Sequence, residues 1–184
     1  MLTLASPQTI VRAYFDEARN LINSAATIKT SEVHGKIAAA IILCFSATEA
    51  FFNSFYYILA KEKNHSEVLH LIVAMRAHKK RLGLRNKIID WTKQLFSGKQ
   101  IDEKILDKFL EIQRRRNELV HISGGDLSIN YGNIEIKGLH DLKFFHEIDI
   151  QYGLETLAIC RELIGAVGQL AGNDKDQFLQ LWTG

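Results

Sequence analysis

The sequence predicts an all-α fold: an up-and-down bundle of four to five main helices with a small β-hairpin insertion near residues 127–137. Three observations predict it. Apolar residues recur at intervals of three and four through several long segments. Hydrophobic residues make up 47% of the chain, which has one proline. The links between the periodic segments are short and carry helix-capping residues. Because 184 residues suit one hydrophobic core, we expect a single domain over 1–184.

The first predicted helix begins at Ser6-Pro7. The serine can cap free amides, and the N–H that proline lacks has no hydrogen-bond partner in the first turn of a helix. Its apolar face is predicted to include Tyr14, Ala18, Leu21 and Ala25. The second helix is predicted from Glu32 to Lys63 and is apolar nearly all round from Ile37 onward. It is therefore expected to be the central helix of the bundle.

The remaining elements follow similar signals. Alternating apolar residues flank Gly132-Asn133, which predicts the hairpin. Gly165 and Gly168 are expected to allow close packing of the last long helix. The predicted helices are a short one after Ser66, an apolar segment around Trp91, one capped by Asp102, a long one from His146 to Ala171, and a short one capped by Asp174.

Composition favours a reduced, cytoplasmic protein with no membrane partner. Residues 1–10 lack the features of a secretory signal. The apolar run from Ile37 to Ala60 would permit a membrane span by length, but Glu49 lies at its centre. A carboxylate there would cost about 2.5–3.5 kcal/mol on insertion scales. Cys44 and Cys160 have no metal-binding or redox-motif spacing and are interpreted as core residues.

Two ions interrupt apolar seams. On the helix after Asp102, the seam of Ile105, Phe109, Ile112 and Leu119 is completed by Arg116. On the central helix, the equivalent missing member is Glu49, with Asn53 one turn later. An unpaired buried charge is costly, so Arg116 must reach solvent, a buried anion or a phosphate. We hypothesise that the two seams face each other and that these ions form a site with Asn117 and His121.

A basic segment precedes this helix. Between Arg76 and Lys93 the chain carries seven Lys or Arg residues against one acidic residue, Asp90. Such a segment can hold phosphates by releasing counterions, although a solvated helix face is the alternative. The residues predicted to bind a phosphate-bearing substrate are Arg115, Arg76, Lys79, Lys80, Arg81 and Asn53.

The residues near Arg116 suit phosphodiester chemistry. Asn117 and His121 are four residues apart and share one helix face. Guanidinium can clamp a phosphate, and imidazole can move protons near neutral pH, so no metal or other cofactor is required. The alternative is structural: Arg116 and Glu49 form a buried salt bridge, and His121 interacts with the helix C-terminus.

The sequence Arg116-Asn117-x-x-x-His121, following a helix with Ala47-Thr48-Glu49-Ala50, resembles the HEPN domains. The resemblance covers mainly residues 37–60 and 102–122. It implies a HEPN-like helical bundle, metal-independent endoribonuclease activity, and a homodimer that joins two motifs in one cleft. It also implies a toxin or other defence role, with an antitoxin such as a nucleotidyltransferase as a partner. Within it, Arg116, Asn117 and His121 match the motif, and Glu49 matches an acidic residue on an earlier helix.

The sequence therefore predicts an endoribonuclease that cuts RNA through its 2′-hydroxyl groups. Arg116 is expected to bind the scissile phosphate, His121 to act as general acid or base, Asn117 to orient the site, and Glu49 to hold Arg116 or His121. The alternative function is a non-catalytic module that binds a partner protein, a nucleotide or a nucleic acid.

Overall fold

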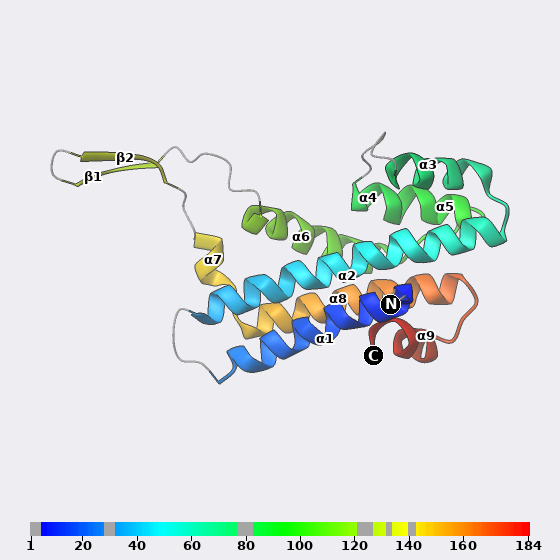
Figure 1. Ribbon diagram of the computed structural model, residues 1–184, viewed down its shortest axis with the longest axis horizontal. Helices are drawn as coiled ribbons and strands as arrows, with labels where there is room; N and C mark the ends of the chain where they lie inside the picture. The colour runs from blue at the N-terminus through cyan, green and yellow to red at the C-terminus, as the bar shows by residue number, and fades with distance from the viewer. Residues whose placement is uncertain (1–4, 28–31, 77–82, 121–126, 132–133, 140–142) are drawn as a thin grey trace, which may run out of the picture.

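The computed structural model describes residues 5–27, 32–76, 83–120, 127–131, 134–139 and 143–184 (Figure 1). It is an all-α bundle, in agreement with the predicted fold class. Within the described residues, four helices have 18 residues or more: α1 (Pro7–Ala25), α2 (Glu32–Glu62), α6 (Glu103–Val120) and α8 (Ile150–Leu170). Consecutive members of this set run in opposite directions (Figure 1).

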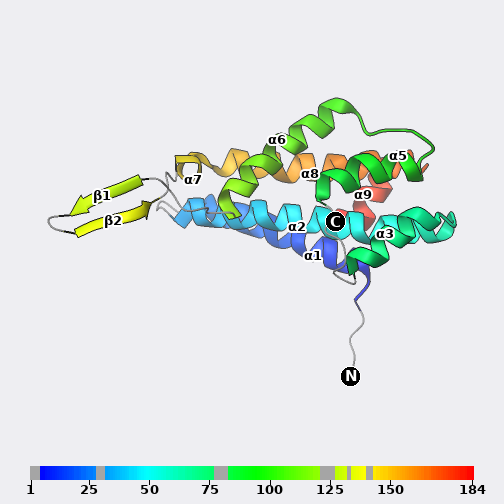
Figure 2. The same ribbon diagram turned by 90° about the horizontal axis from the view of Figure 1, so that it is seen from above.

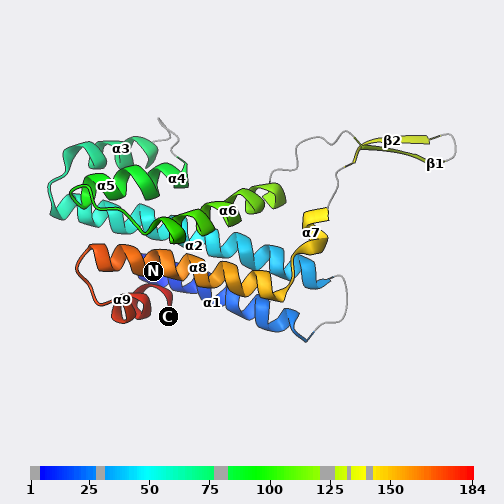
Figure 3. The ribbon, with the colours of Figure 1, turned by 180° about the vertical axis from the view of Figure 1, so that it is seen from behind.

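α2 is the central helix, as predicted. α1 and α8 pack along it on one side, and the helical segments between residues 66 and 120 cover the other (Figures 1 and 3). It is long and apolar enough to cross a membrane by length and composition, and 56% of its most apolar window is buried inside the bundle. A central bundle helix has both properties, since its neighbours surround it.

The ends of three helices follow from local capping. The Ser6 hydroxyl accepts a hydrogen bond from the Thr9 amide at 3.2 Å, which confirms the predicted start of α1. The Asp102 carboxylate accepts from the Lys104 amide at 2.9 Å in the first turn of α6. Asp174 accepts from the Gln177 amide at 2.9 Å and starts α9 (Lys175–Thr183), again as predicted.

The predicted long helix from His146 was wrong at its beginning. Residues Lys143–Glu147 form a separate short helix, α7, and α8 starts at Ile150. The break lies at Ile148-Asp149, where the Asp149 carboxylate accepts from the Tyr152 amide at 2.8 Å. An N-cap residue adopts extended backbone, so a helix cannot run through it.

The apolar face predicted for α1 was also wrong at one position. Tyr14 is 37% exposed. The buried stripe of α1 instead contains Val11, Phe15, Ala18, Ile22 and Ala25. The predicted and the observed faces are neighbours on the helix and share Ala18 and Ala25. The observed face, which contains Phe15 and Ile22 and no polar group, is the one that packs against the bundle.

Two further features complete the bundle. α8 and α9 approach closely at Gly168, where a Cβ atom would lie 2.6 Å from Cγ of Phe178; this confirms the close packing predicted for that glycine. α3 (Ser66–Arg76), α4 (Leu84–Asn86), the π-helical turn η1 (Lys87–Trp91) and α5 (Thr92–Leu95) pack together over the C-terminal half of α2 (Figure 2).

Two short strands, β1 (Leu127–Tyr131) and β2 (Ile134–Leu139), pair antiparallel and extend beyond the helices (Figure 1). Ile129 pairs with Ile136, and Tyr131 pairs with Ile134. The turn predicted at Gly132-Asn133 lies outside the described residues.

Candidate functional site

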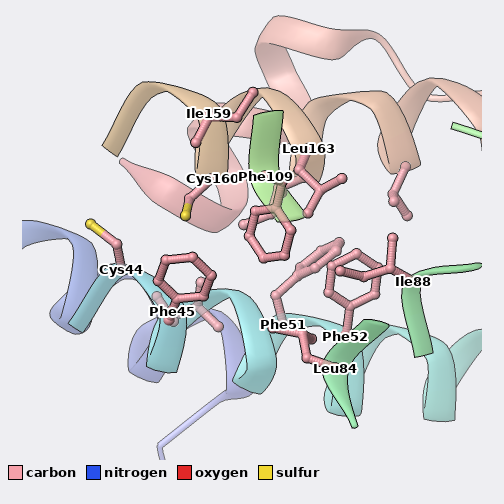
Figure 4. Close-up of a cluster of buried hydrophobic side chains, with 14 of the residues drawn as sticks. Cys44, Phe45, Phe51, Phe52, Leu84, Ile88, Phe109, Ile159, Cys160 and Leu163 are labelled. Atoms are coloured by element: carbon pink, nitrogen blue, oxygen red, sulfur yellow. The ribbon is translucent and has the colours of Figure 1, made fainter. Parts of the chain in front are cut away.

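The predicted apolar seams of α2 and α6 do meet. α6 crosses α2 in the opposite direction, and the rings of Phe45 and Phe109 lie 5.0 Å apart between centroids. Both rings are buried. Figure 4 shows Phe109 pointing between Phe45 of α2 and Leu163 of α8. This contact fixes α6 on the bundle and thereby sets the position of the charged residues at its C-terminal end.

Arg116 lies over the same apolar surface, two turns after Phe109. Its guanidinium carbon is 5.7 Å from the centroid of the Phe45 ring, within the range of a cation–π contact. Nη1 donates a hydrogen bond to Oδ1 of Asn117 at 3.1 Å. Nε is buried and has no hydrogen-bond partner among the described residues. Arg116 is thus the half-buried cation that the sequence predicted, with donor capacity left over.

Glu49 does not pair with Arg116. Its Oε1 accepts a hydrogen bond from Nζ of Lys87 at 2.7 Å. Lys87 is 1% exposed, whereas the Glu49 side chain is 46% exposed. The expectation that Glu49 would hold Arg116 was therefore wrong, and its alternative, that Glu49 would hold His121, concerns a residue outside the described ranges. Arg116 lies over Phe45, and Glu49 is one turn further along α2, toward the end where η1 packs.

Lys87 is the site-adjacent residue that sequence reasoning missed, although a signal existed. Leu84, Lys87, Ile88 and Trp91 follow the three–four spacing of a buried helical seam. Lys87 is the misplaced ion on it, just as Arg116 and Glu49 are on theirs. In the sequence it was counted only as one charge of a basic segment. The same test applied to every seam would have marked Lys87 as a buried cation that needs a counter-ion.

Arg115 turns toward α8 rather than toward Phe45. Its Nη2 lies 3.7 Å from Oε1 of Glu111, and its guanidinium carbon is 5.9 Å from the centroid of the Tyr152 ring. Burial raises the pKa of Tyr152 to about 12; the nearby guanidinium of Arg115 works in the opposite direction. Adjacent arginines on α6 therefore serve different surfaces.

The other predicted site residues are placed only in part. Asn117 is exposed beside Arg116. Oδ1 of Asn53 is buried and has no hydrogen-bond partner among the described residues. His121, Lys79, Lys80 and Arg81 lie outside the described residues, and so does the side chain of Arg76 at the end of α3. The chain is described up to Val120, one residue before His121.

A cavity of about 480 Å³ lies between α6 and α8, on the Arg115 side of α6. Three carboxylates line it against one lysine, and these would repel a polyanion. Among the described residues, no group of three or more His, Cys, Asp or Glu is placed to hold a metal ion. The lining residues are Lys108, Glu111, Ile112, Tyr152, Glu155, Ala158, Ile159 and Glu162.

No family model matches this chain, and no curated protein or solved structure is significantly similar to it. Any assignment of function therefore depends on the chemistry of its own residues.

Proposed function

We propose that the protein is a metal-independent endoribonuclease with a HEPN-like bundle and the Arg116-x4-His121 motif as its catalytic centre. One observation carries the proposal. The guanidinium of Arg116 is half-buried over Phe45, one of its nitrogens lacks a partner, and no carboxylate pairs with it among the described residues. A cation in that state is suited to receive an anion from outside, and a phosphate matches its planar donors.

The proposed reaction needs only groups of the protein and the RNA. The 2′-hydroxyl oxygen attacks the adjacent phosphorus while a base removes its proton. The bond to the 5′-oxygen breaks, and an acid protonates that leaving oxygen. The products are a 2′,3′-cyclic phosphate and a free 5′-hydroxyl. Arg116 holds the charge that develops on the phosphoryl oxygens, and His121 supplies one of the two proton transfers.

Asn117 has a positioning role in this scheme. Its Oδ1 accepts the hydrogen bond from Arg116 Nη1, which restricts the guanidinium over Phe45. Glu49 enters the scheme through Lys87: their ion pair attaches η1, in the basic segment, to α2. The positive charge of the segment from Arg76 to Lys93 would then attract RNA over long range toward α6 and Arg116.

The second proton transfer requires another group. In a symmetric homodimer, His121 of the partner subunit would supply it. A role as a toxin or defence effector acting on cytoplasmic RNA, restrained by an antitoxin protein, fits such an enzyme because uncontrolled RNA cleavage must be restrained.

The decisive experiment measures RNA cleavage in EDTA by wild type, His121→Ala, Arg116→Ala and Arg114→Ala. We expect the first two variants to lose at least about 100-fold in rate. Arg114 is an exposed arginine on the same helix and is the matched control, expected to stay close to wild type. Circular dichroism should show all four to be equally folded.

Cyclic-phosphate ends on the products would support the mechanism. Undiminished cleavage by His121→Ala would refute it. Salt-sensitive RNA binding without any cleavage would indicate a nucleic-acid-binding module instead.

A further inference from the structure

Three aromatic rings meet at one end of the bundle, near the C-terminal end of α6 and at α7, the short helix that precedes α8. The ring centroid of His34, near the start of α2, lies 5.7 Å from that of His146 and 6.0 Å from that of Phe145. The rings of Phe145 and His146 are also 5.7 Å apart. His146 is exposed, whereas the other two are partly buried. The ring of His146 therefore lies at the surface and contacts the partly buried rings of His34 and Phe145.

The support beneath His146 is fixed by a tertiary hydrogen bond. Nδ1 of His34 lies 2.8 Å from the backbone oxygen of Ile148. A carbonyl oxygen can only accept, so Nδ1 carries the hydrogen and donates it. Ile148 is fully buried. This bond ties the α7–α8 junction to α2, so the position of His146 does not depend on α7 alone.

The cluster lies near the C-terminal end of α6, the helix that carries Arg116. α7 contacts α6, and all three ribbon views place it next to the C-terminal end of that helix (Figures 1, 2 and 3). Arg115 of α6 packs over the ring of Tyr152, which is only six residues after His146. α7 thus carries an exposed aromatic ring near the end of the helix that bears Arg116.

We propose that His146, supported by His34 and Phe145, is a binding subsite for a nucleobase of single-stranded RNA next to the scissile phosphate. This inference rests on the proposed function. Unpaired bases are recognised by stacking on aromatic rings, histidine included, and every base presents a face for it. The three carboxylates of the cavity between α6 and α8 lie on the Arg115 side of α6 and repel phosphates, which favours Arg116 as the contact for the RNA backbone.

Stacking predicts an effect on substrate binding rather than on proton transfer. We expect His146→Ala to raise KM about fivefold or more and to change kcat by less than about twofold on an unstructured RNA containing every dinucleotide step. His146→Phe and His146→Trp should restore KM, because they retain a ring. His70→Ala is the matched control: His70 is an exposed histidine on α3, at the opposite end of the bundle, and its loss should alter neither constant.

Binding can be measured separately from cutting in the His121→Ala background. Fluorescence anisotropy with the same labelled RNA should show weaker binding when His146→Ala is added, and recovered binding with His146→Phe. Replacing the base that flanks the mapped cut by an abasic nucleotide should remove the difference between these variants.

Failure of this inference is distinguishable from failure of the proposed function. If His121→Ala abolishes cleavage but His146→Ala keeps the wild-type KM, the base subsite is wrong and the nuclease stands. If His146→Phe does not restore activity, kcat falls, and one limb of the pH–rate profile is lost, His146 transfers a proton and does not stack. If His121→Ala still cuts, the proposed function itself is wrong.

Discussion

Lys87 and Arg116 are both cations on apolar helical seams, and they differ in what neutralises them. Lys87 is 1% exposed and is paired with Glu49 at 2.7 Å. Arg116 is half-buried over an aromatic ring, bonded to a neutral amide, and has no carboxylate partner among the described residues. A charge on a buried seam therefore does not by itself indicate a site. The informative property is whether the fold supplies the counter-ion.

The largest predicted effect tests the ion pair between Lys87 and Glu49. Glu49→Ala would leave the buried ammonium of Lys87 unpaired, and we expect it to lower the free energy of unfolding by about 3 kcal/mol. Lys87→Met is the matched control. It leaves Glu49, whose side chain is 46% exposed and can be hydrated, so the loss should stay below about 1 kcal/mol. Urea unfolding at neutral pH measures both values.

Equal losses from the two substitutions would contradict this asymmetry. They would mean that the pair acts as an exposed salt bridge. Lys87 would then need the counter-ion Glu49 no more than Arg116 needs one.

This asymmetry also marks the limit of what the sequence could predict. Helix starts at Ser6, Asp102 and Asp174 were predictable because a cap is decided within four residues. The partner of Glu49 was not, because it depends on where α6 and η1 cross α2. Periodicity placed each ion on a seam but carried no information about position along the neighbouring helix.

The start of α8 shows the same limit in another form. His146 fits an apolar-periodic helix running to Ala171, and only the Asp149 cap separates α7 from α8. That cap was visible in the sequence as an aspartate before an apolar residue. Its consequence, the three-ring cluster with His34, was not, since His34 is 112 residues away in the chain.

The layer between α2 and α8 is buried, and alkaline pH tests whether water reaches it. Cys160 is fully buried on α8, and burial raises the pKa of its thiol from 9.0 to about 12. Between these values the unfolded chain releases a proton that the folded chain keeps. The contribution of Cys160 is thus complete below pH 9, and stability falls by about 1.4 kcal/mol per pH unit above it.

Cys160→Ala should flatten this decline in urea unfolding between pH 9 and 10.5, whatever its effect on stability at pH 7. An unchanged slope would mean that water reaches the layer between α2 and α8. Burial also raises the pKa of Cys44, so some decline should remain in the variant.

A smaller change in the free energy of unfolding, of either sign, is expected from substituting Arg116. Arg116→Leu removes a charge that has no carboxylate partner and keeps an apolar side chain over Phe45. We therefore expect the free energy of unfolding to stay within about 1 kcal/mol of wild type while RNA cleavage is lost. A loss as large as that of Glu49→Ala would show that Arg116 is a structural ion like Lys87.

The smallest predicted effect concerns the arginine next to it. Arg115 packs over Tyr152, where its positive charge favours the phenolate and opposes the effect of burial. Arg115→Ala should therefore raise the pKa of Tyr152 above its value of about 12. The onset of tyrosine titration, followed by NMR of the ring carbons with Tyr152→Phe to assign the signal, measures the shift. If the titration does not move, Arg115 does not stay over Tyr152 in solution, and the two arginines do not serve different surfaces.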